Sequence, residues 1–155
     1  MMKILKILSL LFAFSISSYG NSTEINIDSL SKQAVKEKKH ILIFFHMKYC
    51  PYCEKMVDES FEDKKVKQTL KKDFIVVDIN TNDNENIIYQ EFKGDKSKFA
   101  KEMDISFYPT VLFLDEENEV AYTLRGYRDK KKFKKVLRFI KSKSYEDMDF
   151  TEFTD

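Results

Sequence analysis

The chain has 155 residues, which leaves room for one domain of ordinary size and argues against a second catalytic domain. Its 27 basic and 26 acidic residues give a net charge of +1, so no overall positive field favours nucleic acid as a partner. With 14 phenylalanines and 8 tyrosines against three glycines and two prolines, the composition can fill a core and argues against disorder.

The first 20 residues have the three-part layout of a secretory signal peptide. Lys3 and Lys6 precede an apolar run over residues 7–16, and a short polar stretch ends at Gly20. The apolar run is shorter than the roughly 20 residues that span a bilayer. We therefore expect cleavage before Asn21 and release into the periplasm, rather than an uncleaved anchor. Loss of the two lysines leaves a mature net charge near −1.

The mature chain is expected to begin with a helix followed by a buried strand. Asp28 or Ser29 can cap the helix, which continues to about Lys38 with a thin apolar stripe. A continuous apolar run then predicts a strand over residues 40–47, buried on both faces.

Two cysteines, the only ones in the chain, come just past the end of this strand at Cys50 and Cys53. From Pro51 onward apolar residues recur at helical spacing. A break near residues 62–63 divides this helix from a second amphipathic piece, and residues 74–79 are expected to form a second buried strand.

The second half begins with a polar, Asn-rich connection over residues 81–98, longer than the usual four to six residues. Apolar residues within 99–103 mark a short helix. Residues 110–114 and 119–124 read as strands joined by a charged turn, which suggests an antiparallel hairpin.

Asp129 is expected to cap a last helix with an apolar stripe and a lysine-rich outer face. We expect the acidic tail, residues 145–155, to be a frayed or docked end whose aromatic side chains pack on the domain. The domain itself is assigned to residues 21–144. Its order of elements predicts an α/β fold, a central mixed β-sheet flanked by helices, with an extra helix at the N-terminus.

The Cys-x-x-Cys pair lies where a buried strand passes into a helix. The first sulfur, that of Cys50, then stands at the helix N-terminus, where free N–H groups and the helix dipole stabilise a thiolate. Pro51 suits the first turn, and Cys53 falls one turn further in. We expect Cys50 to be the nucleophile and Cys53 the resolving thiol. His46 and Lys48 could stabilise the thiolate if their side chains turn toward it.

Two other interpretations of the pair were weighed. A structural disulfide closing a four-residue loop stabilises a fold by about 2 kcal/mol, against about 3 kcal/mol for fifteen residues, so it is a weak staple. A zinc site would need His46 or His40 to complete the ligand set, and the sequence offers no second Cys-x-x-Cys or His pair. We therefore predict redox exchange and no metal.

The run Tyr-Cys-Pro-Tyr-Cys-Glu-Lys-Met at residues 49–56, together with Ile-Ser-Phe-Tyr-Pro-Thr at residues 105–110, resembles the thioredoxin superfamily. The similarity covers most of the mature chain. It is closest to exported thioredoxin-like proteins of the SoxW-like group. The resemblance implies a thioredoxin fold and thiol:disulfide exchange, with Tyr49, Pro51 and Tyr52 forming the active-site loop around the cysteines.

The resemblance also implies that Pro109 follows a cis peptide bond and faces the two sulfurs, while the Tyr108 backbone binds a substrate peptide; a trans proline in an ordinary turn is the alternative. This proline is implied to keep metal from the thiols. Two positions depart from the thioredoxin pattern. Tyr49 replaces the tryptophan before the first cysteine, and Phe44 replaces the buried aspartate that assists the second.

The activity expected is reduction of protein disulfides by a monomer that a membrane or periplasmic electron donor re-reduces. No cofactor is expected, since no glutathione signature accompanies the Cys-Pro-Tyr-Cys run. An isomerase is disfavoured, because about 20 residues before the first strand cannot supply a dimerisation domain. The alternatives are an oxidant that introduces disulfides and a non-catalytic adaptor with a thioredoxin fold.

Overall fold

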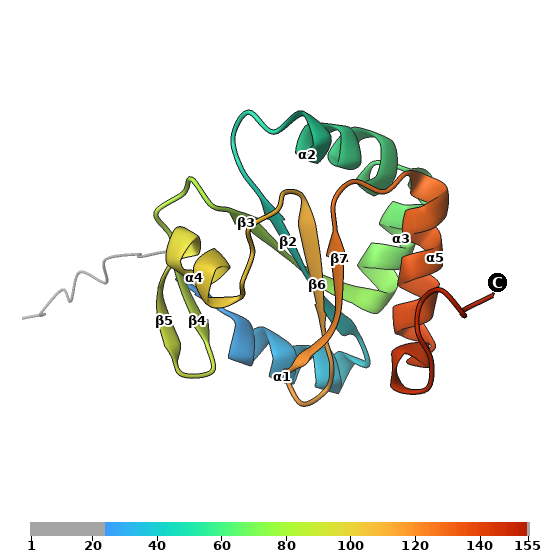
Figure 1. Cartoon of the computed structure of the whole chain (residues 1–155). Coiled ribbons are helices and arrows are strands. Elements are labelled where there is room, and N and C mark those ends of the chain that lie inside the picture. The colour runs from blue at the N-terminus through green and yellow to red at the C-terminus, as the bar shows by residue number, and fades with distance from the viewer. Residues whose placement is uncertain (1–23, 155) are drawn as a thin grey trace, which may run out of the picture.

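The apolar run that the sequence singles out forms the central strand of a four-stranded mixed sheet. In the computed structural model, which describes residues 24–154, this strand is β2 (His40–His46). It pairs in parallel with β3 (Phe74–Asn80) and antiparallel with β6 (Thr110–Leu114). β7 (Val120–Arg125) lies antiparallel to β6 at the edge, so the order is β3-β2-β6-β7 (Figure 1). The predicted signal peptide lies outside the described residues.

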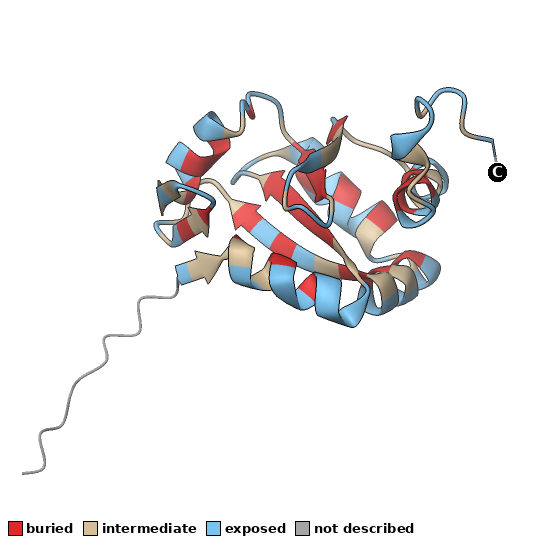
Figure 2. Ribbon diagram, turned by 90° about the horizontal axis from the view of Figure 1, so that it is seen from below, coloured by how far each residue is buried: buried red, intermediate tan, exposed pale blue. Residues whose placement is uncertain are grey.

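Helices cover both faces of this sheet because β2 is apolar on both. Ile41, Ile43 and Phe45 point into one core cluster, with α1 and α4, whereas Leu42 and Phe44 point into a second, with α2, α3 and α5. Buried residues follow the central strands and the inner helix faces (Figure 2). The helices are α1 (Ile27–Glu37), α2 (Pro51–Met56), α3 (Lys64–Asp73), α4 (Lys96–Glu102) and α5 (Lys130–Lys141). Within residues 24–154, none of them is both long and apolar enough to cross a membrane.

The cap predicted for the first helix was wrong. The residue before the helix is Asn26, whose side-chain oxygen accepts a hydrogen bond from the Ser29 backbone at 2.8 Å. Asp28 lies inside the first turn and accepts instead from the Gln90 backbone N–H at 2.9 Å and from the Asn118 amide at 2.7 Å. The helix starts earlier because Ile27, which is fully buried, is already part of its core face.

The expectation of an irregular connection over residues 81–98 was also wrong. This segment contains the hairpin β4 (Asn86–Tyr89) and β5 (Phe92–Asp95). β1 (Glu24–Asn26) pairs in parallel with β4, and the three strands form a second sheet in the order β1-β4-β5. Each strand is three or four residues long, too short for alternation to stand out in an Asn-rich sequence.

Buried contacts hold this second sheet against the central one. Ile87 and Tyr89 alternate inward, and the Tyr89 ring packs edge-on against Phe99 of α4 at 5.7 Å between centroids. Lys96 is only 3% exposed, and its ammonium lies 2.5 Å from a carboxylate oxygen of Glu85. A buried lysine needs such a partner, so the pair fixes the start of α4 to the loop before β4.

The other predicted elements are confirmed to within a few residues. The two strands of the charged hairpin are antiparallel, with β6 and β7 joined at residues 115–119. The break near residues 62–63 is the start of α3, capped by Asp63, which accepts from the Lys65 and Val66 backbone N–H groups. Asp129 caps α5 as predicted. The fold is the thioredoxin-like α/β fold expected from the sequence.

The C-terminal tail packs on the domain through its aromatic side chains, as expected. Beyond a 3₁₀ turn at Ser144–Glu146, the rings of Phe150 and Phe153 lie 5.4 and 5.3 Å from that of Phe139, which is 1% exposed. The Lys135 ammonium lies 5.1 Å from the centre of the Phe150 ring. The tail therefore closes the core over α5 rather than hanging free.

We expect Phe150→Ala to lower the free energy of unfolding by about 2 kcal/mol, because a half-buried ring is lost from this cluster. Urea denaturation followed by circular dichroism measures the change. The matched control is Met148→Ala in the same tail, an exposed side chain whose loss should cost no more than about 0.5 kcal/mol. Equal effects of the two changes would contradict docking of the tail.

Candidate active site

The first cysteine stands where β2 turns into α2. Tyr49 has a left-handed backbone, with φ of 59°, and this turn brings Cys50 to the position before the first helical residue, Pro51. The Cys50 carbonyl accepts from the Cys53 N–H at 3.0 Å and from the Glu54 N–H at 3.1 Å. Its sulfur also accepts from the Cys53 N–H, at 3.2 Å. The Cys50 sulfur thus caps the helix N-terminus by accepting from one of its free N–H groups.

Cys50 and Cys53 are joined by a disulfide, with their Cα atoms 5.2 Å apart. Cys50 is partly exposed, whereas Cys53 is 3% exposed. The described part of the chain holds no other cysteine. One sulfur is accessible to a partner and the other is shielded one helical turn inside. This asymmetry allows intermolecular attack at Cys50 and intramolecular resolution by Cys53.

A π-helical turn extends α2, which sequence reasoning did not anticipate. It spans Val57–Phe61, and the Glu62 N–H bonds to the Val57 carbonyl at 2.9 Å. The turn directs Ser60 inward, where its fully buried hydroxyl donates to the Arg128 carbonyl at 2.6 Å. Such single turns are common near functional sites and leave no pattern in one sequence. Here it ties the cysteine helix to the loop before α5.

Tyr127, in the same loop, forms a second tie to the cysteine helix. Its hydroxyl donates to the Glu59 carboxylate, and this hydrogen bond, with burial and the nearby negative charge, raises the pKa of Tyr127 to about 12. The Lys55 ammonium lies 4.9 Å from the centre of the Tyr127 ring, and the Tyr52 ring lies 6.5 Å away. A hydrogen bond, a cation–π contact and a ring contact therefore hold Tyr127 against the outer side of the cysteine helix.

The loop that carries Tyr108 and Pro109 lies at the same end of the sheet as the cysteines. The peptide bond between these two residues is cis. Thr110 pairs with Phe45, so Pro109 comes next to the end of β2 from which the cysteine turn emerges. The Pro109 carbonyl accepts from the Gly126 N–H at 2.8 Å, which joins this loop to the end of β7.

The two residues that the sequence placed on the approach to Cys50 have other partners. His46 Nε2 lies 2.9 Å from Asp78 Oδ1 on the neighbouring strand, and its ring stacks on that of Phe44 at 5.1 Å. The Lys48 backbone N–H donates to the Asn82 side chain at 2.7 Å. The structure therefore pairs His46 with a carboxylate rather than with the sulfur of Cys50.

A cavity of about 430 Å³ adjoins the buried cysteine. Its walls include Cys53 and four ionisable side chains from three segments, namely His46, Lys48, Glu54 and Asp58. Phe44, which stands in place of the buried aspartate of the thioredoxin pattern, is 3% exposed and packs among apolar residues. Phe44 therefore offers Cys53 no ionisable group, whereas four ionisable side chains line the cavity that Cys53 also lines.

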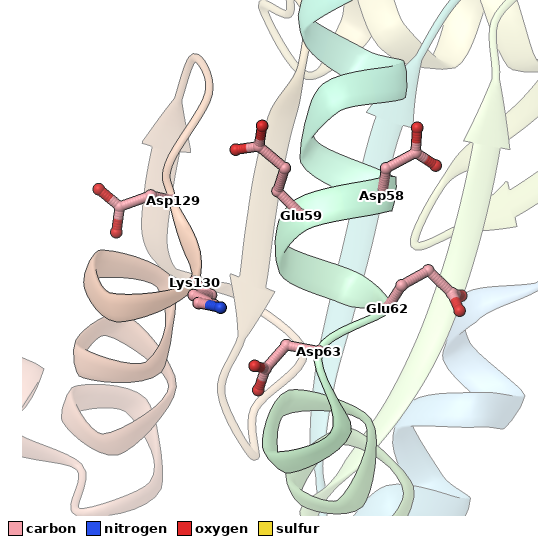
Figure 3. Close-up of a pocket in the computed structure, with 6 residues that line it drawn as sticks. All are labelled: Asp58, Glu59, Glu62, Asp63, Asp129 and Lys130. Carbon is pink, nitrogen blue, oxygen red and sulfur yellow. The ribbon is translucent and has the colours of Figure 1, made fainter.

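A second cavity, of about 320 Å³, lies away from the cysteines and is lined by carboxylates (Figure 3). Asp63 and Asp129 serve as helix caps, and Glu59 and Glu62 bond to Tyr127 and Lys67. In Figure 3 Asp58 and Glu62 point away from Asp129. Within residues 24–154, no group of three or more His, Cys, Asp or Glu side chains is placed to hold a metal ion. Asp63, Asp129, Glu59 and Glu62 therefore have structural partners.

The fold and the cysteine site together define a thioredoxin-type protein whose bridged Cys-x-x-Cys pair fits thiol:disulfide exchange. Residues 27–141 match the family described as a thioredoxin-like domain, and the chain belongs to that family. A comparison with curated proteins gave no match.

Solved structures show the same fold. A thioredoxin-fold protein from Helicobacter pylori is 23% identical with a TM-score of 0.64, and the match covers 72% of this chain and 74% of that one. A thioredoxin from Thermus thermophilus is 22% identical with a TM-score of 0.60, over 76% and 85% of the two chains. The DsbH oxidoreductase is 14% identical with a TM-score of 0.51, over 92% and 96%.

We expect Ser60→Ala to lower the free energy of unfolding by about 1 to 2 kcal/mol, because it removes a buried hydroxyl whose acceptor is then left without that donor. Chemical denaturation of the oxidised protein measures this. Ser142→Ala is the matched control, since the Ser142 hydroxyl also donates to a backbone carbonyl but is exposed. Its effect should stay within about 0.5 kcal/mol.

Proposed function

We propose that this chain is a periplasmic thiol:disulfide oxidoreductase that reduces protein disulfides through Cys50 and Cys53. The observation that carries the proposal is the asymmetry of the bridged pair. Cys50 is partly exposed at a helix N-terminus, and Cys53 is buried one turn away within bonding distance. A structural staple has no need of one accessible sulfur, whereas dithiol exchange does.

In the proposed reaction the Cys50 thiolate attacks a substrate disulfide, and one substrate sulfur leaves as a thiol. The Cys53 N–H, which donates to the Cys50 sulfur, and the dipole of the helix N-terminus stabilise the thiolate form of Cys50. Cys53 then attacks the Cys50 sulfur of the mixed disulfide. The second substrate sulfur leaves, and the Cys50–Cys53 disulfide seen in the structure is the oxidised product.

The surface around the pair supports a polypeptide as the substrate. The side chains of Tyr49, Tyr52 and Phe107 are 94%, 64% and 63% exposed, on the loops that carry the cysteines and Pro109. Large exposed apolar side chains grouped in this way are typical of binding surfaces. In the proposed complex they contact the substrate, and the Tyr108 backbone bonds to an extended peptide segment.

The proposal also covers the cellular location of the protein, the direction of its reaction and its partners. The basic start and short apolar run within residues 1–20 support export to the periplasm. There the chain would act as a monomer and as a reductant, re-reduced by a membrane or periplasmic electron donor. Relatives in fold include the C-terminal domain of DsbD from Neisseria meningitidis, which was solved in both oxidised and reduced forms.

We expect the wild-type protein to accelerate insulin reduction by dithiothreitol severalfold or more, and Cys50→Ser to abolish that acceleration. Turbidity of the precipitating insulin chains measures the rate. Matched unfolding curves of the reduced wild-type and variant proteins show that the variant is folded. A wild-type protein that leaves the rate unchanged would support a non-catalytic adaptor instead.

The equilibrium between the pair and glutathione or dithiothreitol buffers tests the direction of the reaction. For a reductant we expect a reduction potential near the roughly −270 mV of thioredoxin. Mass spectrometry after alkylation gives the fraction reduced at each buffer ratio. A potential near about −120 mV would instead make the protein an oxidant, since its reduced form would then be the more stable one.

A further inference from the structure

Resolution of the mixed disulfide needs a proton acceptor for Cys53. A thiol attacks as its thiolate, and burial in apolar surroundings disfavours that charge. Cys53 is 3% exposed, and the buried Phe44 side chain is apolar and offers it no base. The acceptor must therefore come from the cavity that adjoins Cys53.

Among the side chains that line this cavity, His46 is the one suited to the task. Glu54 and Asp58 are exposed to solvent, and solvated carboxylates are weak bases at neutral pH. A lysine ammonium such as that of Lys48 has no lone pair to offer. Imidazole both accepts and releases a proton near neutral pH. The His46 side chain is 23% exposed, so it is mostly shielded but still in reach of water.

The contacts of His46 fix which ring nitrogen is the base. Asp78 Oδ1 lies 2.9 Å from Nε2, and a carboxylate can only accept, so Nε2 carries the hydrogen. Nδ1 then holds the free lone pair. The Phe44 ring stacks on the imidazole with an interplanar angle of 16°, which holds its plane.

We infer that His46 Nδ1 accepts the proton of Cys53 through water in this cavity, with Asp78 as its positioning residue, when the mixed disulfide is resolved. The inference rests on the proposed function and deepens it. His46 and Asp78 lie on the neighbouring strands β2 and β3, outside the helix that carries the cysteines.

The step balances in atoms and electrons. Cys53 gives its proton to His46, and its thiolate forms a bond to the Cys50 sulfur. The bond between Cys50 and the substrate sulfur breaks, and its electron pair leaves with the substrate. The protonated imidazole then releases its proton to that thiolate or to solvent, so the products are the Cys50–Cys53 disulfide and a substrate thiol.

The charged groups around His46 come from three segments. Asp78 on β3 is in direct contact with the imidazole ring. Glu54 and Asp58 from the cysteine helix, and Lys48 just past β2, line the same cavity as His46.

The test separates the two chemical steps. The fully reduced protein is mixed with excess oxidised glutathione, quenched in acid at set times and analysed by mass spectrometry. The glutathione adduct on Cys50 forms in a first phase and decays, as Cys53 resolves it, in a second. We expect His46→Gln to slow the second phase on the order of tenfold at pH 7 and to change the first less than twofold.

The pH dependence of the second phase distinguishes a proton acceptor from a residue that only supports the structure. In the wild type, the second phase should accelerate through neutral pH, and His46→Gln should flatten that rise. Asp78→Asn keeps an oxygen that can accept from Nε2, so it should slow the second phase less than His46→Gln does. His40→Gln is the matched control, because His40 starts the same strand at its other end, and it should change neither phase.

An unchanged second phase in His46→Gln would overturn the inference, as would loss of the phase in Glu54→Gln or Asp58→Asn alone. Equal slowing of both phases would make His46 structural and would overturn it too. Failure of the proposed function is seen separately, since a wild-type protein that forms no glutathione adduct and leaves insulin intact performs no exchange at all.

Discussion

Burial of β2 on both faces is the constraint from which the rest of the structure follows. A strand with Leu42 and Phe44 on one side and Ile41 and Ile43 on the other exposes apolar surface in two directions, so helices must cover both. The strand is therefore central in the four-stranded sheet, and its pairing with β3 and β6 fixes the position of its end. The cysteine turn leaves from that fixed end, which places Cys50 on a rigid support.

The position of the cysteine helix depends on polar contacts at its far side. The buried hydroxyl of Ser60 bonds to the loop before α5, and Tyr127 bonds to Glu59 in the same region. These contacts connect α2 to the end of β7, and the Gly126–Pro109 hydrogen bond connects β7 to the cis-proline loop. The two loops that flank the disulfide are thus joined through the sheet edge.

The chemistry of the site depends on where a proton can go once Cys53 is buried. Phe44 is buried and offers no proton acceptor, whereas His46, two residues further along the same face of β2, stacks on the Phe44 ring and pairs with Asp78. In the mechanism that we infer, His46 supplies the proton acceptor that Phe44 cannot.

The sequence by itself determined the order of the main elements, the α/β class and the identity of the redox pair, because long apolar runs and a Cys-x-x-Cys spacing are local signals. It did not determine the Asn26 cap, the β4–β5 hairpin within residues 81–98 that pairs with β1, or the π-helical turn at Val57–Phe61. Those features depend on contacts between distant residues, such as Asp28 with Asn118 and Ser60 with Arg128. The pairing of His46 with Asp78 also depends on tertiary structure. Asp78 is 32 residues further along the chain, and only the pairing of β2 with β3 brings the two side chains together.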